Sequence, residues 1–304
     1  FQLVNTEFDI LDNLTSGSAL PNGELIDSVV VASAGGYDSS TTQVVGTYTD
    51  DLVISARDTV SNGFNEANYA ITYVEGALKI DPRMVTLTAL QQSKLYGDTM
   101  TLDGELFTIA DQGDAADSAL PNGEMIDTVT LLSATGVAGS TTADVQMYVN
   151  EIKITDQAGS ASFDAANYDF TYVDGNLLVS PRPITVTALE QGKIYGNVES
   201  FGGDVDSLDG LKFEVTDVDT DAFLPNGELI TSTTMDYAFG DDLGVSSTAG
   251  VGTTGNVIKI TGVTGNAGDL TSKAFNEDNY NITFVKGQYT IAPRPITVTA
   301  RQQG

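Results

Sequence analysis

The sequence contains no cysteine and no histidine. Without cysteine, disulfides and thiolate metal sites cannot stabilise the fold, so side-chain packing must do so. Without histidine, the chain lacks the side chain that most often acts as a general base or binds a metal through imidazole. Nucleophilic triads and zinc sites of the usual type are therefore excluded.

Basic side chains are also scarce. The chain has 13 Lys and Arg against 42 Asp and Glu, which gives a formal net charge of −29. Because contacts to phosphate need clustered Lys and Arg, this charge balance argues against nucleic acid and anionic lipid as partners. The acidic surface has two interpretations. It keeps the protein soluble in a salty exterior that screens the repulsion, or its carboxylates bind divalent cations, most plausibly calcium.

Long hydrophobic runs are missing as well. No apolar run approaches the ~18 residues of a membrane span, so we expect no direct membrane insertion. The first residues resemble neither a Met start nor a signal peptide, and any targeting segment is expected outside these residues.

The residues that are present are typical of strands joined by turns. Hydrophobic residues make up 41% of the 304-residue chain, with 12 Tyr and 12 Phe, and Thr, Val, Gly, Asn and Asp are frequent. A chain of this length has enough apolar material for two or three separate cores. We therefore expect an all-β protein of more than one domain.

Three sequence blocks recur in the same order along the chain. The block LPNGE begins at Leu20, Leu120 and Leu224. A block that runs from Asn-Tyr to Pro-Arg begins at Asn68, Asn167 and Asn279. A block of the type ITVTALEQGKIYGN begins at Val85, Ile184 and Ile296. Equivalent blocks lie about 100 residues apart, which is the size of a small domain.

The repeats predict domains that join at the Pro-Arg pairs. We expect a first β module lacking its opening strand at 1–82, a second at 83–181, a third at 182–293, and the opening strand of a following module at 294–304. Proline favours extended backbone in itself and in its predecessor, and no Gly-Ser spacer separates the modules. Successive modules are therefore expected to form a stiff line.

Period-2 patterns within each repeat predict half-buried strands. In residues 184–188, Ile184, Val186 and Ala188 share one face and the threonines share the other. LPNG places Pro where φ is near −65° and Asn-Gly where φ can be positive. We expect at most a helical turn before each Asn-Tyr pair. The predicted fold is a tandem array of about 100-residue β-sandwich modules, Ig-like or β-grasp-like, with about six or seven strands each, forming an elongated rod.

One predicted strand of each repeat is aromatic. Its inward positions are Tyr69, Ile71 and Tyr73, then Tyr168, Phe170 and Tyr172, then Tyr280, Ile282 and Phe284. We expect these side chains to form the module core. The following VEG, VDG and VKG, which begin at Val74, Val173 and Val285, are interpreted as hairpin turns.

The best candidate binding site is the acidic loop before LPNGE. Its carboxylates are Asp217, Asp219 and Asp221 in the third repeat and Asp111, Asp114 and Asp117 in the second. Alternate acidic residues in a loop can direct several oxygens at a hard cation such as calcium. The loop lacks the Gly and the distal Glu of the helix-loop-helix calcium motif, so a solvated acidic loop is the other interpretation. No other cofactor is expected.

Two further patterns bear on chemistry. Lys94 and Lys193 recur beside aromatic strands, where the Lys stem covers a core edge or, alternatively, forms an internal Lys-to-Asn cross-link. A carboxylate pair of the glycosidase type is available among the acidic residues, but the acidic residues that recur lie in turns of several repeats, whereas a catalytic pair is normally unique. We therefore expect no enzyme.

The combined motifs suggest a family. The order K-x-Y-G-D, LPNGE, VGTY and NYxITYVxGxLxIxPR resembles the bacterial adhesin repeat called the MBG domain, YGX type. The matching residues are Lys94 to Asp98, Lys193 to Asn197, Val45 to Tyr48, the three LPNGE blocks and the three blocks that end in Pro-Arg. The second repeat departs from the pattern, with VQMY from Val145 to Tyr148.

This resemblance implies a structural function without catalytic residues. The expected protein is extracellular or on a bacterial cell surface, where modules form the stalk of a filamentous-haemagglutinin-like or biofilm adhesin and mediate cohesion. Its expected partners are neighbouring modules or other copies of the protein, and surface polysaccharide. Two alternatives remain open: a filament subunit that polymerises by strand donation from residues 294–304, and a carbohydrate-binding module.

Overall fold

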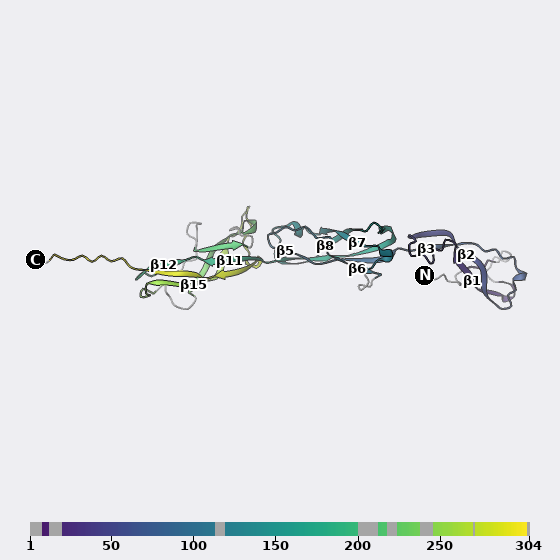
Figure 1. The fold of residues 1–304 in the computed structure, drawn as a ribbon, viewed down its shortest axis with the longest axis horizontal. Helices are drawn as coiled ribbons and strands as arrows, with labels where there is room; N and C mark the ends of the chain where they lie inside the picture. The colour runs from purple at the N-terminus through teal and green to yellow at the C-terminus, as the bar shows by residue number, and fades with distance from the viewer. Residues whose placement is uncertain are drawn as a thin grey trace. The chain divides into compact units, whose positions relative to one another are not determined.

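The computed structural model describes residues 8–11, 20–112, 119–199, 212–217, 224–237, 246–269 and 271–302. Throughout these ranges the regular elements are β-strands and short 3-10 turns, and none is an α-helix (Figure 1). The all-β prediction is therefore confirmed. Within the same ranges, no helix is long and apolar enough to cross a membrane.

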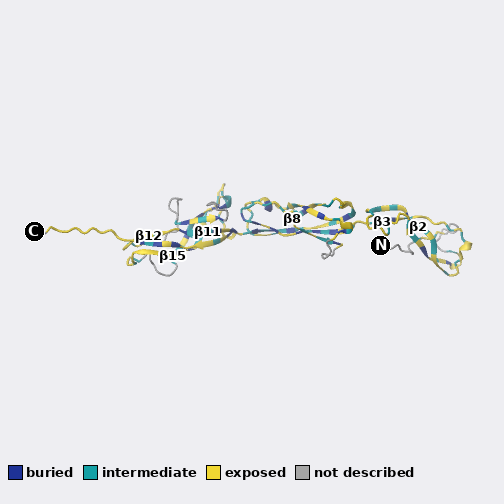
Figure 2. Ribbon diagram, viewed as in Figure 1, coloured by how far each residue is buried: buried dark blue, intermediate teal, exposed yellow. Residues whose placement is uncertain are grey.

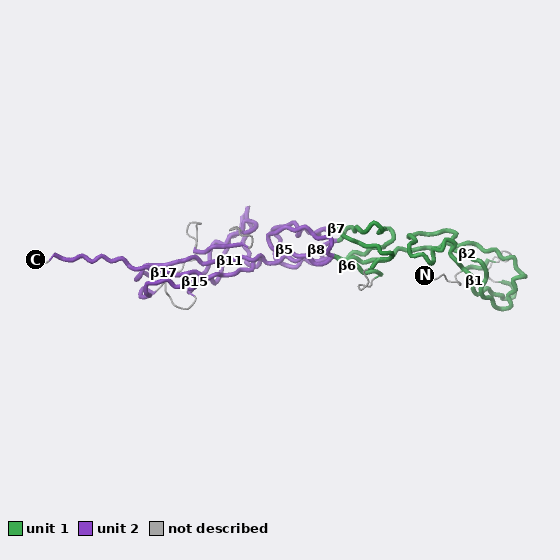
Figure 3. Tube along the Cα trace, viewed as in Figure 1, with its two compact units in different colours: residues 1–88, 107–130, 154–173 green, residues 89–106, 131–153, 174–304 purple. Residues whose placement is uncertain are grey.

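The chain divides into two compact units (Figure 3). The first comprises residues 1–88, 107–130 and 154–173, and the second comprises residues 89–106, 131–153 and 174–304. These units do not coincide with the sequence repeats, because residues of the second repeat belong to both. The module boundaries expected from the sequence remain a prediction.

The described residues of the second repeat form seven strands in two sheets. They are β4 (Arg83–Ala89), β5 (Gln92–Leu95), β6 (Phe107–Asp111), β7 (Ile126–Ser133), β8 (Gln146–Gly159), β9 (Tyr168–Val173) and β10 (Gly175–Ser180). The sheet orders are β6-β4-β9 and β5-β10-β8-β7.

The third repeat contains the same arrangement. Its strands are β11 (Arg182–Ala188), β12 (Gln191–Ile194), β13 (Phe213–Asp217), β14 (Ile230–Tyr237), β15 (Gly252–Gly265), β16 (Tyr280–Val285) and β17 (Gly287–Ala292). Its sheets are β13-β11-β16 and β12-β17-β15-β14, and β15 also lies against β11 and β16 of the other sheet. The fold of the repeat is thus sandwich-like. The short strands β5 and β12 are additional to the segments that the sequence patterns predict.

The first repeat has one described sheet, β1 (Leu25–Ser33), β2 (Gly46–Ser61) and β3 (Gly76–Ile80), in that order. Residues 69–74 have the aromatic pattern of β9 and β16 but are not a strand. β9 and β16 pair in parallel with β4 and β11. The alternating pattern alone is therefore not sufficient to give a strand.

The alternating strands bury the predicted face (Figure 2). In β11, Ile184, Val186 and Ala188 are all buried, as expected. The prediction for the aromatic strand is only partly correct, because Tyr280 is buried whereas Phe284 is 37% exposed. β16 is the edge strand of its sheet, so Phe284, near the end of this strand, has a neighbouring strand on one side only.

The predicted turns form at LPNG. Asn22 and Gly23 have φ of 58° and 73°, and the other two blocks repeat this conformation. The corresponding 3-10 turns are η1 (Pro21–Gly23), η3 (Pro121–Gly123) and η7 (Pro225–Gly227). A helical turn also precedes each aromatic segment, at η2 (Glu66–Asn68), η5 (Ala165–Asn167) and η8 (Glu277–Asn279). In these turns the side chain of the preceding Asn or Asp accepts a backbone N–H.

The expected hairpins at VDG and VKG are wrong. β16 and β17 lie in different sheets, and both run parallel to the segment 182–194. A Cβ on Gly287 would lie 2.6 Å from the Ala188 carbonyl O and 2.9 Å from that of Leu189. Glycine is therefore needed because two backbones cross closely here, not because the chain reverses.

Gly287→Ala is expected to destabilise the third repeat by about 1–3 kcal/mol, because the added methyl group overlaps two carbonyl oxygens. Gly255→Ala is the matched control, since nothing lies within 4 Å of its Cβ position. Amide hydrogen exchange of peptides from β16 and β17 measures the effect. Equal protection in the two variants would show that the crossing tolerates a side chain.

Candidate functional site

The predicted calcium loops are only partly described. Asp114, Asp117, Asp219 and Asp221 lie outside the described residues, and within the described part of the chain no three Asp or Glu residues are grouped to hold a metal. Asp111 accepts a hydrogen bond from Arg83 Nε at 2.7 Å, and Asp217 is paired with Arg182. These two carboxylates therefore neutralise arginines, and the calcium site stays a prediction.

An extensive polar cluster surrounds Arg182, at the start of the third repeat and, as far as the structure describes it, wholly inside the second unit. Its Nε lies 2.9 and 2.8 Å from the two carboxylate oxygens of Asp217, and its Nη1 donates to Asp98 Oδ1 at 2.6 Å. The same Nη1 lies 3.3 Å from the Tyr96 carbonyl O. Burial lowers the pKa of Arg182, but the hydrogen bonds to Asp217 and Asp98 outweigh it and raise the pKa. The guanidinium thus joins the second repeat to the third.

The glycine of the Y-G-D motif makes this contact possible. Gly97 has φ of 87°, a conformation that other residues rarely adopt. A Cβ at Gly97 would also lie 2.5 Å from Cβ and Cγ of Pro225, in the LPNGE block of the next repeat. The two motifs that define the repeats are therefore in direct contact in the second unit.

A buried glutamate joins two tyrosines beside the arginine. Glu228, the last residue of LPNGE, is fully buried and accepts hydrogen bonds from Tyr96 and, at 3.0 Å, from Tyr280. The two rings meet edge to face with centroids 5.6 Å apart. Burial, and then the nearby Glu228 carboxylate, raise the pKa of both tyrosines. Both hydroxyls therefore remain protonated donors at neutral pH.

Two asparagines extend the junction toward the loop before β8. Asn226 Nδ2 donates to the Thr141 carbonyl O at 2.9 Å. Asn279 is buried; its Oδ1 accepts the Val145 N–H at 3.0 Å, and its Nδ2 donates to Asp144 at 3.0 Å. Side chains of the third repeat thus satisfy backbone groups of the second.

An ion pair completes the junction. Lys273 Nζ donates to Asp144 Oδ1 at 2.6 Å and to the Thr142 carbonyl O at 2.9 Å, and it lies 4.9 Å from the centroid of the Tyr96 ring. Hydrogen bonds from Lys273 and Asn279 lower the pKa of Asp144. We define the junction cluster as Tyr96, Asp98, Asp144, Arg182, Asp217, Glu228, Lys273 and Tyr280.

The first unit contains part of the same arrangement between the first and second repeats. Asn122 Nδ2 donates to the Thr41 carbonyl O at 2.7 Å, and Asn167 Oδ1 accepts the Val45 N–H at 3.1 Å. Because Val45 is equivalent to Val145, Val44 occupies the position of Asp144 in the first junction. Alignment of the two Asn-Tyr pairs likewise places Ala161 at the position of Lys273. The two junctions share their asparagine contacts but differ at the ion pair.

Lys94 holds the loop that receives these contacts. Its Nζ donates to the carbonyl oxygens of Asp98, Val137 and Ser140. Burial lowers the pKa of Lys94. Its partners are main-chain oxygens and not an asparagine side chain, so the contacts favour the interpretation as a structural lysine.

Sequence reasoning found the motifs of the junction cluster but not their contacts. Tyr96 and Glu228 are 132 residues apart, and neither residue type indicates its partner. The available signal was the recurrence of LPNGE and Pro-Arg in all three repeats and of YG in the second and third, which local turn chemistry alone does not require. The hydrogen bonds from Arg182 to Asp98, from Tyr96 to Glu228 and from Lys273 to Asp144 each join a residue of the second repeat to one of the third, so the arrangement connects the repeats.

Arg182→Ala is expected to destabilise the second unit by about 3–5 kcal/mol, because it leaves the buried Asp217 carboxylate without its partner. The control Lys79→Ala removes an exposed pair with Asp81, and its expected cost is about 0–1 kcal/mol. Native-state hydrogen exchange measures both, on peptides from β14 and β17 for Arg182→Ala and on peptides from β2 and β3 for Lys79→Ala. A loss of protection no larger in Arg182→Ala than in the control would contradict a structural junction.

The Glu151 carboxylate predicts that the stability of the loop held by Lys94 depends on pH. Burial raises the pKa of Glu151, but hydrogen bonds from Ser133, Thr135 and Val137 outweigh it, so the folded-state pKa lies below the ordinary value. A depressed carboxyl pKa contributes stability above the unfolded-state pKa of about 4.3, and this stability is lost as the pH falls through the folded-state pKa.

Glu151→Gln is therefore expected to lower the melting temperature at pH 7, and the difference from the wild type should shrink as the pH falls toward 3. Glu105→Gln, at an exposed residue, is the control and should stay close to the wild type at every pH. A constant difference for Glu151→Gln across this range would argue against the charged hydrogen-bonded carboxylate.

The central part of the chain matches a known family. Residues 85–178 match the family model of the MBG domain (YGX type). This range includes Lys94, Tyr96 and Gly97 and the second LPNGE block. The comparisons find no significant match among curated proteins or solved structures. MBG domains are typical of the repeats of bacterial surface adhesins and are structural rather than enzymatic. The resemblance is thus confirmed for residues 85–178 of the second repeat, which are similar to the MBG domain of the YGX type.

Proposed function

We propose that the chain is a tandem structural region, a stalk or filament, of an extracellular bacterial adhesin or biofilm-matrix protein. The observation that carries this proposal is the bridge from Arg182 to both Asp98 and Asp217. A side chain of the linker itself fixes the end of one repeat to the start of the next. A stalk requires such fixed connections, because a flexible linker would let its tip fold back.

The length of the linker supports the same function. β10 ends at Ser180 and β11 begins at Arg182, so only Pro181 lies between the two strands. Proline has a restricted φ, and the residue on each side of it is paired in a sheet. The connection therefore has few rotatable bonds.

Charge fits a surface location. The net charge of −29 keeps such chains soluble, while the neighbouring repeats make contact through local pairs such as Asp144 with Lys273. The partners that we propose are neighbouring modules of the same protein, other copies of it, and surface polysaccharide.

Strand donation is a second candidate, and the segment 294–304 motivates it. Ile296 and Val298 are 81% and 87% exposed, whereas the equivalent Ile184 and Val186 are buried inside a sheet. Residues 69–74 of the first repeat have the same alternating pattern as β9 and β16 but are not a strand. Main-chain pairing between the two segments of different copies would bury both.

Small-angle X-ray scattering tests the stalk. A compact chain of 304 residues has a radius of gyration of about 19 Å, and a stiff row of repeats should give a much larger value in a monomer. A value close to the compact one would contradict the proposal.

Light scattering on the same sample separates the two candidates. A mass of 31.9 kDa at all concentrations supports a covalent stalk. A mass that rises in multiples of 31.9 kDa with concentration, and that falls when Ile296 and Val298 are replaced by Asp, supports strand donation instead.

A further inference from the structure

The third repeat has a pairing geometry that bears on mechanical load. Its first and last segments, residues 182–194 and 280–292, run parallel to each other. Arg182 pairs with Tyr280 at one end, and Ile194 pairs with Ala292 at the other. The register is the same in both sheets, so the crossing at Gly287 introduces no shift.

The chain enters and leaves this pair at opposite ends. It enters the repeat at Arg182, the start of the first segment, and leaves after Ala292, the end of the second. Tension along the chain therefore pulls the two parallel segments in opposite directions along their own axes. Sliding of this kind loads the hydrogen bonds of the ladder together, whereas separation from one end would break them one after another.

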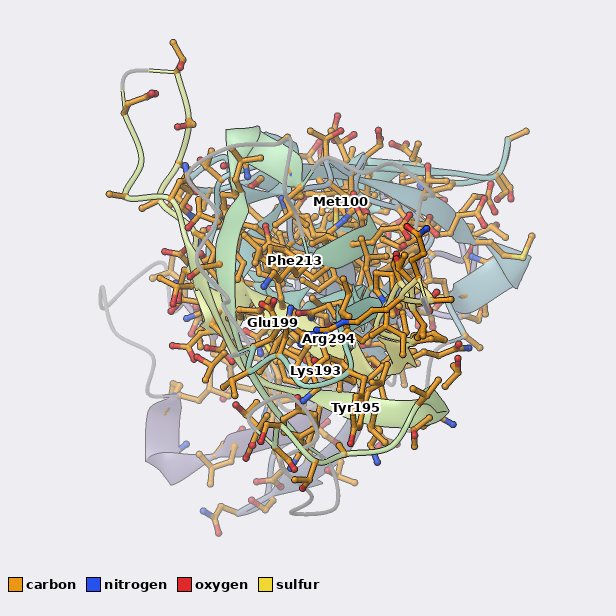
Figure 4. The ribbon with its side chains drawn as sticks, turned by 90° about the vertical axis from the view of Figure 1, so that its left-hand side faces the viewer. Met100, Lys193, Tyr195, Glu199, Phe213 and Arg294 are labelled. Carbon is orange, nitrogen blue, oxygen red and sulfur yellow. The ribbon has the colours of Figure 1, made fainter. Side chains whose placement is uncertain are left out.

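Contacts beyond the ladder hold both ends of the pair. At the entry, Arg182 is bound to Asp217 on β13, the other neighbour of β11. At the exit, the Tyr195 N–H donates to the Ala292 carbonyl O at 2.9 Å. Arg294 then donates to the Tyr195 carbonyl O at 3.1 Å (Figure 4). Arg294 thus binds the Tyr195 carbonyl O at the exit in the same way as Arg182 binds the Tyr96 carbonyl O at the entry.

The segments are also held from their buried side. Ile184 and Val186 on β11, and Tyr289 and Ile291 on β17, are all buried. A slip by one residue would move these side chains from the core to the solvent face. Sliding is therefore resisted by packing as well as by hydrogen bonds.

We propose that the repeat is a shear clamp, a force-bearing module whose first and last segments resist tension applied through the chain ends. This function goes beyond that of a spacer, because a stalk that only sets a distance does not require this strand direction. The pairings of the second repeat have the same direction, β4 with β9 in the first unit and β5 with β10 in the second.

The path of the load between repeats is short. The Tyr96 N–H donates to the Ser180 carbonyl O at 2.9 Å, at the exit of the second repeat. Two residues later, Arg182 starts the paired segment of the third. Force that reaches Ser180 is thus passed to the next clamp without a flexible segment between them.

Single-molecule pulling along two directions tests the clamp. The chain has no cysteine, so introduced cysteines define where DNA handles attach. Pro183→Cys with Pro293→Cys applies shear, and Pro183→Cys with Asn281→Cys pulls apart two residues that pair at the same end. All three residues are exposed. Both variants of the full chain are kept reduced until the handles are attached, and circular dichroism checks that each is folded.

The shear pair is expected to unfold the third repeat at a several-fold higher force than the peeling pair at the same loading rate. Because one substitution is common to both variants, a difference reports the direction of force. Equal forces, or a weaker shear direction, would overturn the clamp. Scattering of the unloaded chain tests the stalk separately, so either proposal can fail while the other stands.

Discussion

The structure of the second unit depends on one buried charge. Moving a guanidinium out of water is costly, and the cost is offset only when carboxylates surround it with good hydrogen-bond geometry. Arg182 finds one such carboxylate in each of two repeats, at Asp98 and Asp217. The ion pairs therefore form together only when the linker, the YG loop and β13 are all in place. Placement of one repeat against the next is thus coupled to the folding of both.

Local chemistry made much of the fold predictable. The alternation at Ile184, Val186 and Ala188 identified β11 and its buried face, because a strand places successive side chains on opposite sides. The Asn-Gly of LPNGE identified turns with positive φ, since these residues adopt that conformation at low cost. Both inferences needed only neighbouring residues.

The predictions that failed or were missing depend on residues far away in the sequence. Gly287 follows a pattern typical of a hairpin, but its role is set by the carbonyl oxygens of Ala188 and Leu189, which lie about a hundred residues earlier. Likewise, nothing near Tyr96 indicates that Glu228 accepts its hydroxyl. The pairing of Asp217 with Arg182 was also not visible in the sequence, and the calcium site expected at the acidic loops stays a prediction.

The parallel register of the third repeat also determines how much chain length is released when the repeat unfolds. Arg182 and Ala292, at the two ends of the paired segments, are the points through which the proposed tension would pass, and the rest of the repeat lies between them in the sequence. If the repeat opens, this chain becomes free to extend by roughly 3.3–3.6 Å for every residue. No disulfide limits that extension, because the chain has no cysteine. Under such a load, each opened repeat would release additional chain length, which lowers the tension on the repeats that remain folded.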